Sequence, residues 1–261
     1  MSLKYAANLS LLWPDLPYLD RFDAAAEAGF SAVEILFPYD LPAKETQRAL
    51  LRNGLELVLI NAPPPNYTGG ERGFAAVPEL AGRFAYDIRR VYRYVDVLKP
   101  KMIHVMAGEA VGDAAKAVFV ENLKRAADDA PAGLTLMIEP LNPVAMPGYF
   151  LNDYALAAEV LAAVDAPNVA LQYDSYHAQM IHGDAVAVFD QYRDLIRHVQ
   201  IGDSPERSAP GTGDVDFAML FGRLRDSGYD GWISGEYHPG GPTEETLGWM
   251  QLDAGNLTTL R

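Results

Sequence analysis

Gly133-Leu134-Thr135-Leu136-Met137-Ile138-Glu139-Pro140 is the stretch from which the rest of the chain can be interpreted. Its apolar and β-branched residues run directly into the carboxylate of Glu139, and Pro140 ends the run. A short apolar run of this kind is typical of a strand that is buried on both faces, as strands of parallel sheets are. The sequence therefore predicts a parallel strand with a carboxylate at its C-terminal end.

Three later runs have the same form, an apolar segment that ends on an oxygen-bearing side chain: Val169–Asp174, Ile196–Gln200 and Trp232–Glu236. Along the chain, short strands of this type alternate with segments of helical periodicity, in the pattern of a (β/α)8 TIM barrel, whose strand ends converge on one rim. An open doubly wound sheet also alternates, but it usually carries a glycine-rich phosphate turn after an early strand. The chain has no G-x-G-x-x-G or P-loop sequence, which favours the barrel.

Length and composition narrow the possible functions. The chain has 261 residues, 49% of them hydrophobic, and no linker-like segment, so we expect one domain over residues 1–261. The formal net charge of −14 disfavours nucleic acid as a partner, because phosphate backbones are bound by clustered Lys and Arg. The absence of cysteine excludes disulfides and thiolate metal sites. No apolar run reaches the ~20 residues of a membrane span, so we expect no membrane partner and a cytoplasmic location.

The side chains at the ends of the four runs form a candidate metal site, made of Glu139, Asp174, Gln200 and Glu236. Consecutive members are separated by about the length of one β/α repeat. Three carboxylates and one amide oxygen are hard ligands, which suit Mg²⁺ or Mn²⁺ better than Zn²⁺. A single carboxylate at a strand end more often caps a helix or pairs with Lys or Arg. The recurrence at four strand ends is what indicates a metal site.

Several motifs resemble the hydroxypyruvate isomerase family, which belongs to the xylose-isomerase-like barrels. In chain order they are Ala7-Asn8-Leu9-Ser10, Phe37-Pro38-Tyr39, Gly70-Glu71-Arg72-Gly73, Ile138-Glu139-Pro140-Leu141-Asn142, Gln172-Tyr173-Asp174-Ser175-Tyr176-His177, His198-Val199-Gln200-Ile201-Gly202-Asp203, Pro210-Gly211-Thr212-Gly213 and Gly235-Glu236-Tyr237. The resemblance covers nearly the whole chain in order, so it is specific.

The resemblance implies an enzyme, an intramolecular aldose–ketose type isomerase that interconverts hydroxypyruvate and 2-hydroxy-3-oxopropanoate (tartronate semialdehyde). It implies that Glu139 and Glu236 bind the metal and also transfer protons as the acid/base pair, with Asp174 and Gln200 as further ligands. The reaction passes through an enediolate, whose negative charge a divalent metal stabilises. Related sugar epimerases have His where Gln200 stands, which favours the hydroxypyruvate isomerase branch.

Four further residues are candidates for substrate binding. His177 follows Asp174 by three residues, and the resemblance supports a contact with substrate oxygens; a loop histidine that donates to the backbone is the alternative. His104 lies near the end of the fourth strand and could help to bind the substrate carboxylate; a buried structural histidine is the alternative. Arg72 and Arg207 are candidates for the substrate carboxylate because bidentate guanidinium matches carboxylate geometry, although either could be a surface residue. His198 is expected to pack deeper in the barrel.

Local signals give three more expectations. Gly211-Thr212-Gly213 is not followed by the Lys of a phosphate-binding loop, and we expect a flexible loop over the barrel mouth. The segment Ala178–Tyr192 is expected to form one helix. Asn152 or Asp153 is expected to cap the helix that runs to about Val164.

Other functions remain possible from the sequence. The same chemistry could act on a four-carbon acid, as in a 2-oxo-tetronate isomerase or a related sugar-acid isomerase or epimerase. A metal-dependent endonuclease of the same superfold would need several His ligands and a basic face, whereas this chain has five His and an excess of acid. A non-catalytic binding protein for a sugar acid would not need two carboxylates on opposite sides of its ligand. We expect a small keto acid as the partner, and a homodimer or homotetramer.

Overall fold

The structure is a computed structural model that describes residues 3–62 and 73–254. The strands form a closed barrel in chain order, so the predicted (β/α)8 fold is confirmed. The strands are β1 (Lys4–Asn8), β2 (Ala32–Ile35), β3 (Glu56–Asn61), β4 (Met102–His104), β5 (Thr135–Ile138), β6 (Val169–Asp174), β7 (Ile196–Ile201) and β8 (Trp232–Gly235). The pairs β1–β2, β1–β8, β3–β4, β4–β5, β5–β6 and β7–β8 are all parallel.

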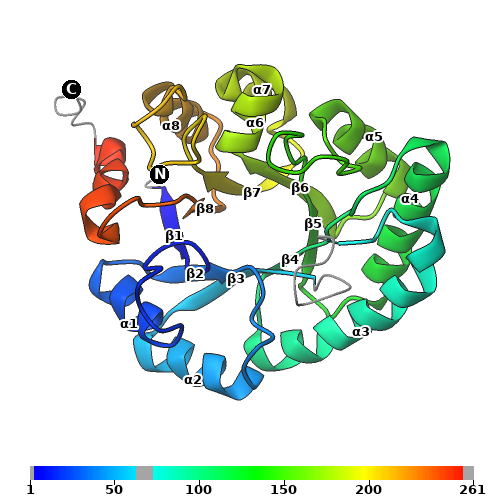
Figure 1. Ribbon diagram of the computed structural model, residues 1–261, viewed down its shortest axis with the longest axis horizontal. Coiled ribbons are helices and arrows are strands. Elements are labelled where there is room, and N and C mark those ends of the chain that lie inside the picture. The colour runs from blue at the N-terminus through cyan, green and yellow to red at the C-terminus, as the bar shows by residue number, and fades with distance from the viewer. Residues whose placement is uncertain (1–2, 63–72, 255–261) are drawn as a thin grey trace. The chain divides into compact units, whose positions relative to one another are not determined.

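The helices follow the strands in alternation (Figure 1). They are α1 (Asp20–Glu27), α2 (Ala43–Asn53), the 3-10 turn η1 (Pro78–Leu80), α3 (Ala81–Leu98), α4 (Gly112–Asp129), α5 (Tyr154–Val164), α6 (Ser175–His182), α7 (Ala185–Tyr192), α8 (Phe217–Asp226) and the 3-10 helix η2 (Thr243–Ala254). Within the described ranges, no helix combines the length and the apolar character that a bilayer crossing needs.

Two local expectations have different outcomes. Asp153 caps α5 as predicted, because its side chain accepts hydrogen bonds from the amides of Ala155 and Leu156. The single helix expected over residues 178–192 is wrong. Gly183 adopts a left-handed conformation (φ 75°) that ends α6, and Asp184 caps a new helix, α7, through the amide of Ala187. A left-handed glycine followed by an N-cap residue is a common way to end one helix and start the next.

The chain divides into two compact units, and the first comprises Met1–Glu34, Ala49–Glu56 and Tyr173–Arg261. In this unit β8 lies between β1 and β7, with Gly235 opposite both Ala7 and Ile201. A side chain at Gly235 would approach the ring of Trp249 to 3.0 Å, so glycine lets this ring, which is 1% exposed, pack against the barrel.

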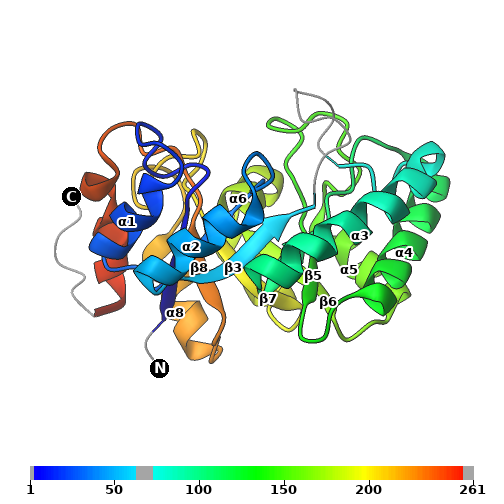
Figure 2. The same ribbon diagram turned by 90° about the horizontal axis from the view of Figure 1, so that it is seen from below.

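The C-terminal helix of this unit is fixed by polar and aromatic contacts. The Trp13 amide donates to the Thr243 hydroxyl at 2.8 Å, and the Trp13 indole donates to Glu244 at 2.6 Å. The Trp249 ring lies 5.2 Å from that of Tyr5 in an edge-to-face arrangement. These contacts hold η2 against β1 and against the segment between β1 and α1. Figure 2 shows η2, in red, next to α1.

The second unit comprises Ile35–Arg48 and Leu57–Gln172. Its helices α3, α4 and α5 follow one another along the strands in Figure 1, and α4 buries Phe119 and Leu123 while the Asn122 amide donates to the Ala75 carbonyl at 2.8 Å. Asn61 and His104 lie opposite each other at the ends of β3 and β4, and β5 pairs with β4 in the same direction. The C-terminal ends of these strands therefore present polar side chains on one side of the unit.

Candidate active site

In the first unit, three of the four predicted metal ligands lie at strand ends. Asp174 is the last residue of β6, Gln200 is next to last in β7, and Glu236 directly follows β8. The Glu236 amide donates to the Ile201 carbonyl at 2.9 Å, which continues the β7–β8 ladder and fixes its backbone. Asp174 and Gln200 are fully buried, and Glu236 is 5% exposed. Buried carboxylates need positive or hydrogen-bonding partners, because taking an ionised group out of water is costly.

Arg207 supplies a positive partner for two of these carboxylates. Its Nη2 nitrogen donates to Asp174 Oδ2 at 2.9 Å and to Glu236 Oε1 at 2.8 Å. The guanidinium carbon also lies 5.3 Å from the ring centre of Tyr176, within the range of a cation–π contact. Arg207 itself has a left-handed backbone (φ 52°). The two carboxylates therefore face a common cationic position.

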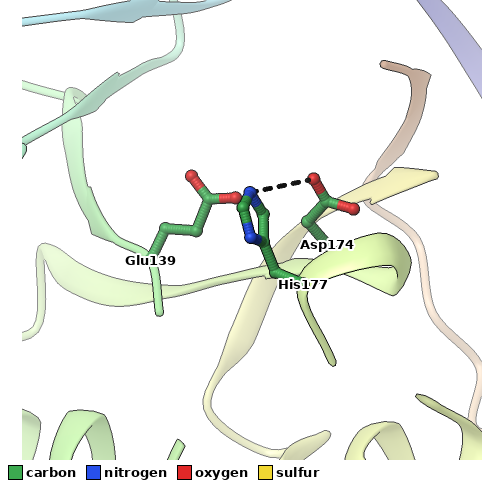
Figure 3. A group of neighbouring side chains, drawn as sticks. All are labelled: Glu139, Asp174 and His177. Carbon is green, nitrogen blue, oxygen red and sulfur yellow. Dashed lines mark ion pairs between the residues drawn. The ribbon is translucent and has the colours of Figure 1, made fainter. Parts of the chain in front are cut away.

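The electrostatics of Asp174 follow from this environment. Burial raises the pKa of Asp174 above its ordinary value, whereas Arg207 and the hydrogen bond from the Tyr176 amide act in the opposite direction. The same carboxylate is the N-cap of α6. Because α6 begins immediately after β6, it carries His177 to within 3.9 Å of Asp174 (Nε2 to Oδ2), the contact drawn as a dashed line in Figure 3. These two candidate site residues therefore lie close together in the first unit.

In the second unit, Glu139 directly follows β5 and is 5% exposed. The Gln172 side-chain amide donates to its Oε2 atom at 2.8 Å, and His104 Nδ1 lies 3.4 Å from the same oxygen. The structure thus places the predicted residues Glu139 and His104 side by side. The contribution of Gln172 was not predicted. Its signal was present, because residues two apart in a strand point to the same side and Gln172 precedes Asp174 by two.

Two side chains of the first unit that could bind a metal, Asp174 and His177, lie close together, and both are labelled in Figure 3. Carboxylate and amide oxygens are the ligands that Mg²⁺ and Mn²⁺ prefer, and the buried acidic charge around Arg207 favours a cation. The residues present therefore fit a divalent ion.

A buried polar network lies beside these ligands in the first unit and was not predicted. Glu34, in the middle of β2, is fully buried and accepts hydrogen bonds from Asn8, His198 and Gln200. The expectation that His198 packs inside the barrel is correct, but the residue is also part of this network. The available signal was a carboxylate inside an otherwise apolar strand, which requires donors from elsewhere in the fold.

The loop after β7 differs from the expectation of a flexible segment. The amides of its glycine-containing turn converge on the buried carboxylate of Asp203: the Oδ2 atom accepts from Gly211, Thr212 and Gly213 at 2.8–2.9 Å. The Oδ1 atom accepts from Ser204 and Val215 at 2.9 and 3.0 Å. The loop that carries Arg207 is therefore tied to Asp203. The other arginine candidate, Arg72, lies outside the described residues.

Comparison with known proteins identifies the family. Residues 22–252 match the family described as "Xylose isomerase-like TIM barrel". The chain belongs to this family. The chain is 42% identical to the 2-oxo-tetronate isomerase of Cupriavidus necator over 95% of this chain and 97% of that protein. It is 36% identical to the hydroxypyruvate isomerase of Escherichia coli over 95% of this chain and 98% of the relative. The resemblance inferred from the motifs is thereby confirmed.

Two solved structures have a similar fold. A crystal structure described as an AP endonuclease of family 2 from Brucella melitensis has a TM-score of 0.91 and 40% identity over 95% of this chain and 98% of that one. The Escherichia coli 3-keto-D-glucoside 4-epimerase has a TM-score of 0.78 at 22% identity, over 95% of this chain and 99% of that one, which supports the fold alone.

Proposed function

We propose that the chain is a metal-dependent aldose–ketose type isomerase that interconverts hydroxypyruvate and 2-hydroxy-3-oxopropanoate. The single observation that carries the proposal is the Arg207 nitrogen shared by Asp174 and Glu236. Two buried strand-end carboxylates that face one cation form an acidic site suited to a divalent ion. The names of the relatives that are 36–42% identical support isomerase chemistry on small oxo acids.

The metal ligands of this proposal are Glu139, Asp174, Gln200 and Glu236, and the ion is Mg²⁺ or Mn²⁺. When bound, the ion supplies a Lewis acid that stabilises negative charge on the substrate oxygens. The protein's own contribution is to remove the ligands from water and to fix their orientation. Gln172 does this for Glu139 by donating to its Oε2 atom.

Glu139 and Glu236 act in this proposal as the acid/base pair. One carboxylate takes a proton from the hydroxyl-bearing carbon beside the ketone, and a proton is returned at the former ketone carbon. The hydroxyl on the first carbon loses its proton and becomes the aldehyde oxygen, while the former ketone oxygen gains a proton. The positioning of a general base or acid is worth about 10²–10⁴-fold in rate. In this proposal His177 and His104 donate hydrogen bonds to substrate oxygens. The position of His177 near Asp174 and that of His104 near Glu139 support these roles.

The substrate carboxylate requires a positive partner in a protein of net charge −14. Arg207 is assigned to this role because its planar guanidinium matches carboxylate geometry and its Nη2 atom already lies between two proposed ligands, Asp174 and Glu236. Arg72 remains a second candidate on the sequence resemblance. A guanidinium in this position would favour substrates that carry a carboxylate over neutral sugars.

A four-carbon substrate is the second candidate function. The 2-oxo-tetronate isomerases of Cupriavidus necator and Pectobacterium atrosepticum are 42% and 39% identical to this chain, compared with 36% for the Escherichia coli hydroxypyruvate isomerase. The two reactions share the same proton transfer and differ in the length of the substrate beyond the reacting carbons. The endonuclease name of one structural neighbour is not adopted, because the excess of acidic residues opposes DNA binding.

The test is a turnover panel on the purified chain. Hydroxypyruvate, 2-oxo-tetronate and a DNA duplex with an abasic site are each assayed after treatment with EDTA and again after Mn²⁺ or Mg²⁺ is restored. We expect metal-dependent isomerisation of one of the two acids and no cleavage of the DNA. Metal-independent turnover, or cleavage of the DNA without isomerisation, would contradict the proposal.

A further inference from the structure

Glu34 stands at the centre of a buried network drawn from three strands, β1, β2 and β7. Its Oε1 atom accepts from Asn8 Nδ2 at 2.8 Å and from Gln200 Nε2 at 2.8 Å. Its Oε2 atom lies 2.7 Å from His198 Nε2. All four side chains are fully buried. An ionised carboxylate so far from water is tolerated only when donors surround it, and here three donors from separate side chains do so.

The hydrogen bond from Gln200 to Glu34 fixes the directions in which the nitrogen and the oxygen of the Gln200 side-chain amide point. A side-chain amide has an oxygen end and a nitrogen end of nearly the same shape, so packing alone does not distinguish them. An ionised carboxylate only accepts hydrogen bonds, so the NH₂ group of Gln200 must face Glu34. The reversed amide would lose a charge-assisted hydrogen bond and place its oxygen against a carboxylate. The oxygen of Gln200 is thereby directed away from Glu34.

The remaining partners keep Glu34 itself in place. Asn8 is held at its other end, because its Oδ1 atom accepts from the Ser10 amide at 2.9 Å. His198 belongs to the same strand as Gln200 and precedes it by two residues, so both side chains point to the same side of β7. Glu34 is thus fixed from two directions, and its carboxylate has little freedom to follow a different Gln200 rotamer.

We propose that Glu34 is a positioning residue that holds the amide oxygen of Gln200 toward the divalent metal. The inference rests on the proposed function, in which Gln200 is a ligand. Metal ligands are commonly oriented by an outer carboxylate that accepts their N–H, and loss of that carboxylate typically weakens metal binding by ~10–100-fold. Glu34 gives a Gln ligand the support that such carboxylates give to a His ligand.

The experiment is a double-mutant cycle on Mn²⁺ affinity, measured by the loss of the free-Mn²⁺ EPR signal during titration. Wild type, Glu34→Gln, Gln200→Leu and the double variant are compared. We expect Glu34→Gln to weaken Mn²⁺ binding at least ~10-fold. In the Gln200→Leu background the same change should have less than a ~3-fold effect, because a residue that acts only through Gln200 has nothing left to position.

The matched control is Asn8→Ala, which removes the other donor to the same Oε1 atom while leaving Gln200 bonded. We expect its Mn²⁺ affinity to stay within ~3-fold of wild type even if its melting temperature falls, because Gln200 keeps its carboxylate partner. An equal loss of affinity in Asn8→Ala and Glu34→Gln would reduce Glu34 to a structural role and overturn the inference.

A second variant keeps the inference testable if Glu34→Gln does not fold. In Gln200→His, one ring nitrogen can donate to Glu34 while the other binds the metal, so Mn²⁺ binding should exceed that of Gln200→Leu. Binding no tighter than in Gln200→Leu overturns the inference. Failure of the proposed function gives a different result, because then wild type itself does not bind Mn²⁺. If wild type binds Mn²⁺ and Glu34→Gln binds it equally well, the inference is overturned while the proposed function stands.

Discussion

Asp203→Asn is predicted to destabilise the loop that carries Arg207. The two carboxylate oxygens accept five backbone amides, three on Oδ2 and two on Oδ1. Asparagine keeps one acceptor oxygen and turns an NH₂ group toward the other set of donors. Hydrogen bonds to a charged group contribute about 1.5–3 kcal/mol each. Residues 211–213 are exposed, so their amides can partly return to water, and the expected net loss is about 2–4 kcal/mol of unfolding free energy.

The loss is measured by urea unfolding, with Asp214→Asn as the matched control. Asp214 lies in the same loop and is exposed, so its substitution makes the same change of charge without the buried bonds. We expect the midpoint to fall for Asp203→Asn and to stay near wild type for Asp214→Asn. We also expect kcat/KM to fall in Asp203→Asn, because Arg207 loses its support. Equal midpoints for the two variants would refute the reasoning.

Three further predictions concern single side chains. Arg207→Met removes the cation shared by Asp174 and Glu236, so added Mn²⁺ should raise its melting temperature by more than that of wild type; an equal rise would contradict the shared cation position. Glu139→Gln should lower kcat by ~10²–10⁴-fold on the preferred oxo acid, and normal turnover with metal bound would remove Glu139 from the acid/base pair. Asp153→Ala should cost about 1 kcal/mol in urea unfolding through loss of the α5 cap, and an unchanged midpoint would argue against that cap.

The strand-end residues could be predicted from sequence because they depend on local patterns. A short apolar run that ends on a carboxylate or an amide predicts that side chain at the end of a buried strand, and this prediction needs no information from other segments of the chain. Asp174, Gln200 and Glu236 all have this position in the structure. The cap of α5 is also local, because Asp153 bonds amides only two and three residues ahead.

The contacts that orient these residues could not be predicted, because their partners are far apart in the chain. Glu34 meets Gln200 from 166 positions away, and nothing in either segment specifies the other. The hydrogen bond from the Gly211 amide to Asp203 could not be predicted for a related reason. Glycines in a loop suggest a flexible backbone, and the sequence does not show that their amides donate to a carboxylate elsewhere in the loop. The break before α7 was missed because Gly183 lies inside an otherwise helical pattern.

The proposed chemistry depends most on a divalent ion held by Glu139, Asp174, Gln200 and Glu236. Crystals grown with Mn²⁺ and measured at the manganese absorption edge test it most directly. We expect one strong anomalous peak within bonding distance of an oxygen of each of the four side chains, with Arg207 Nη2 no longer between Asp174 and Glu236. No peak at this position, with Arg207 still bonded to both carboxylates, would contradict it.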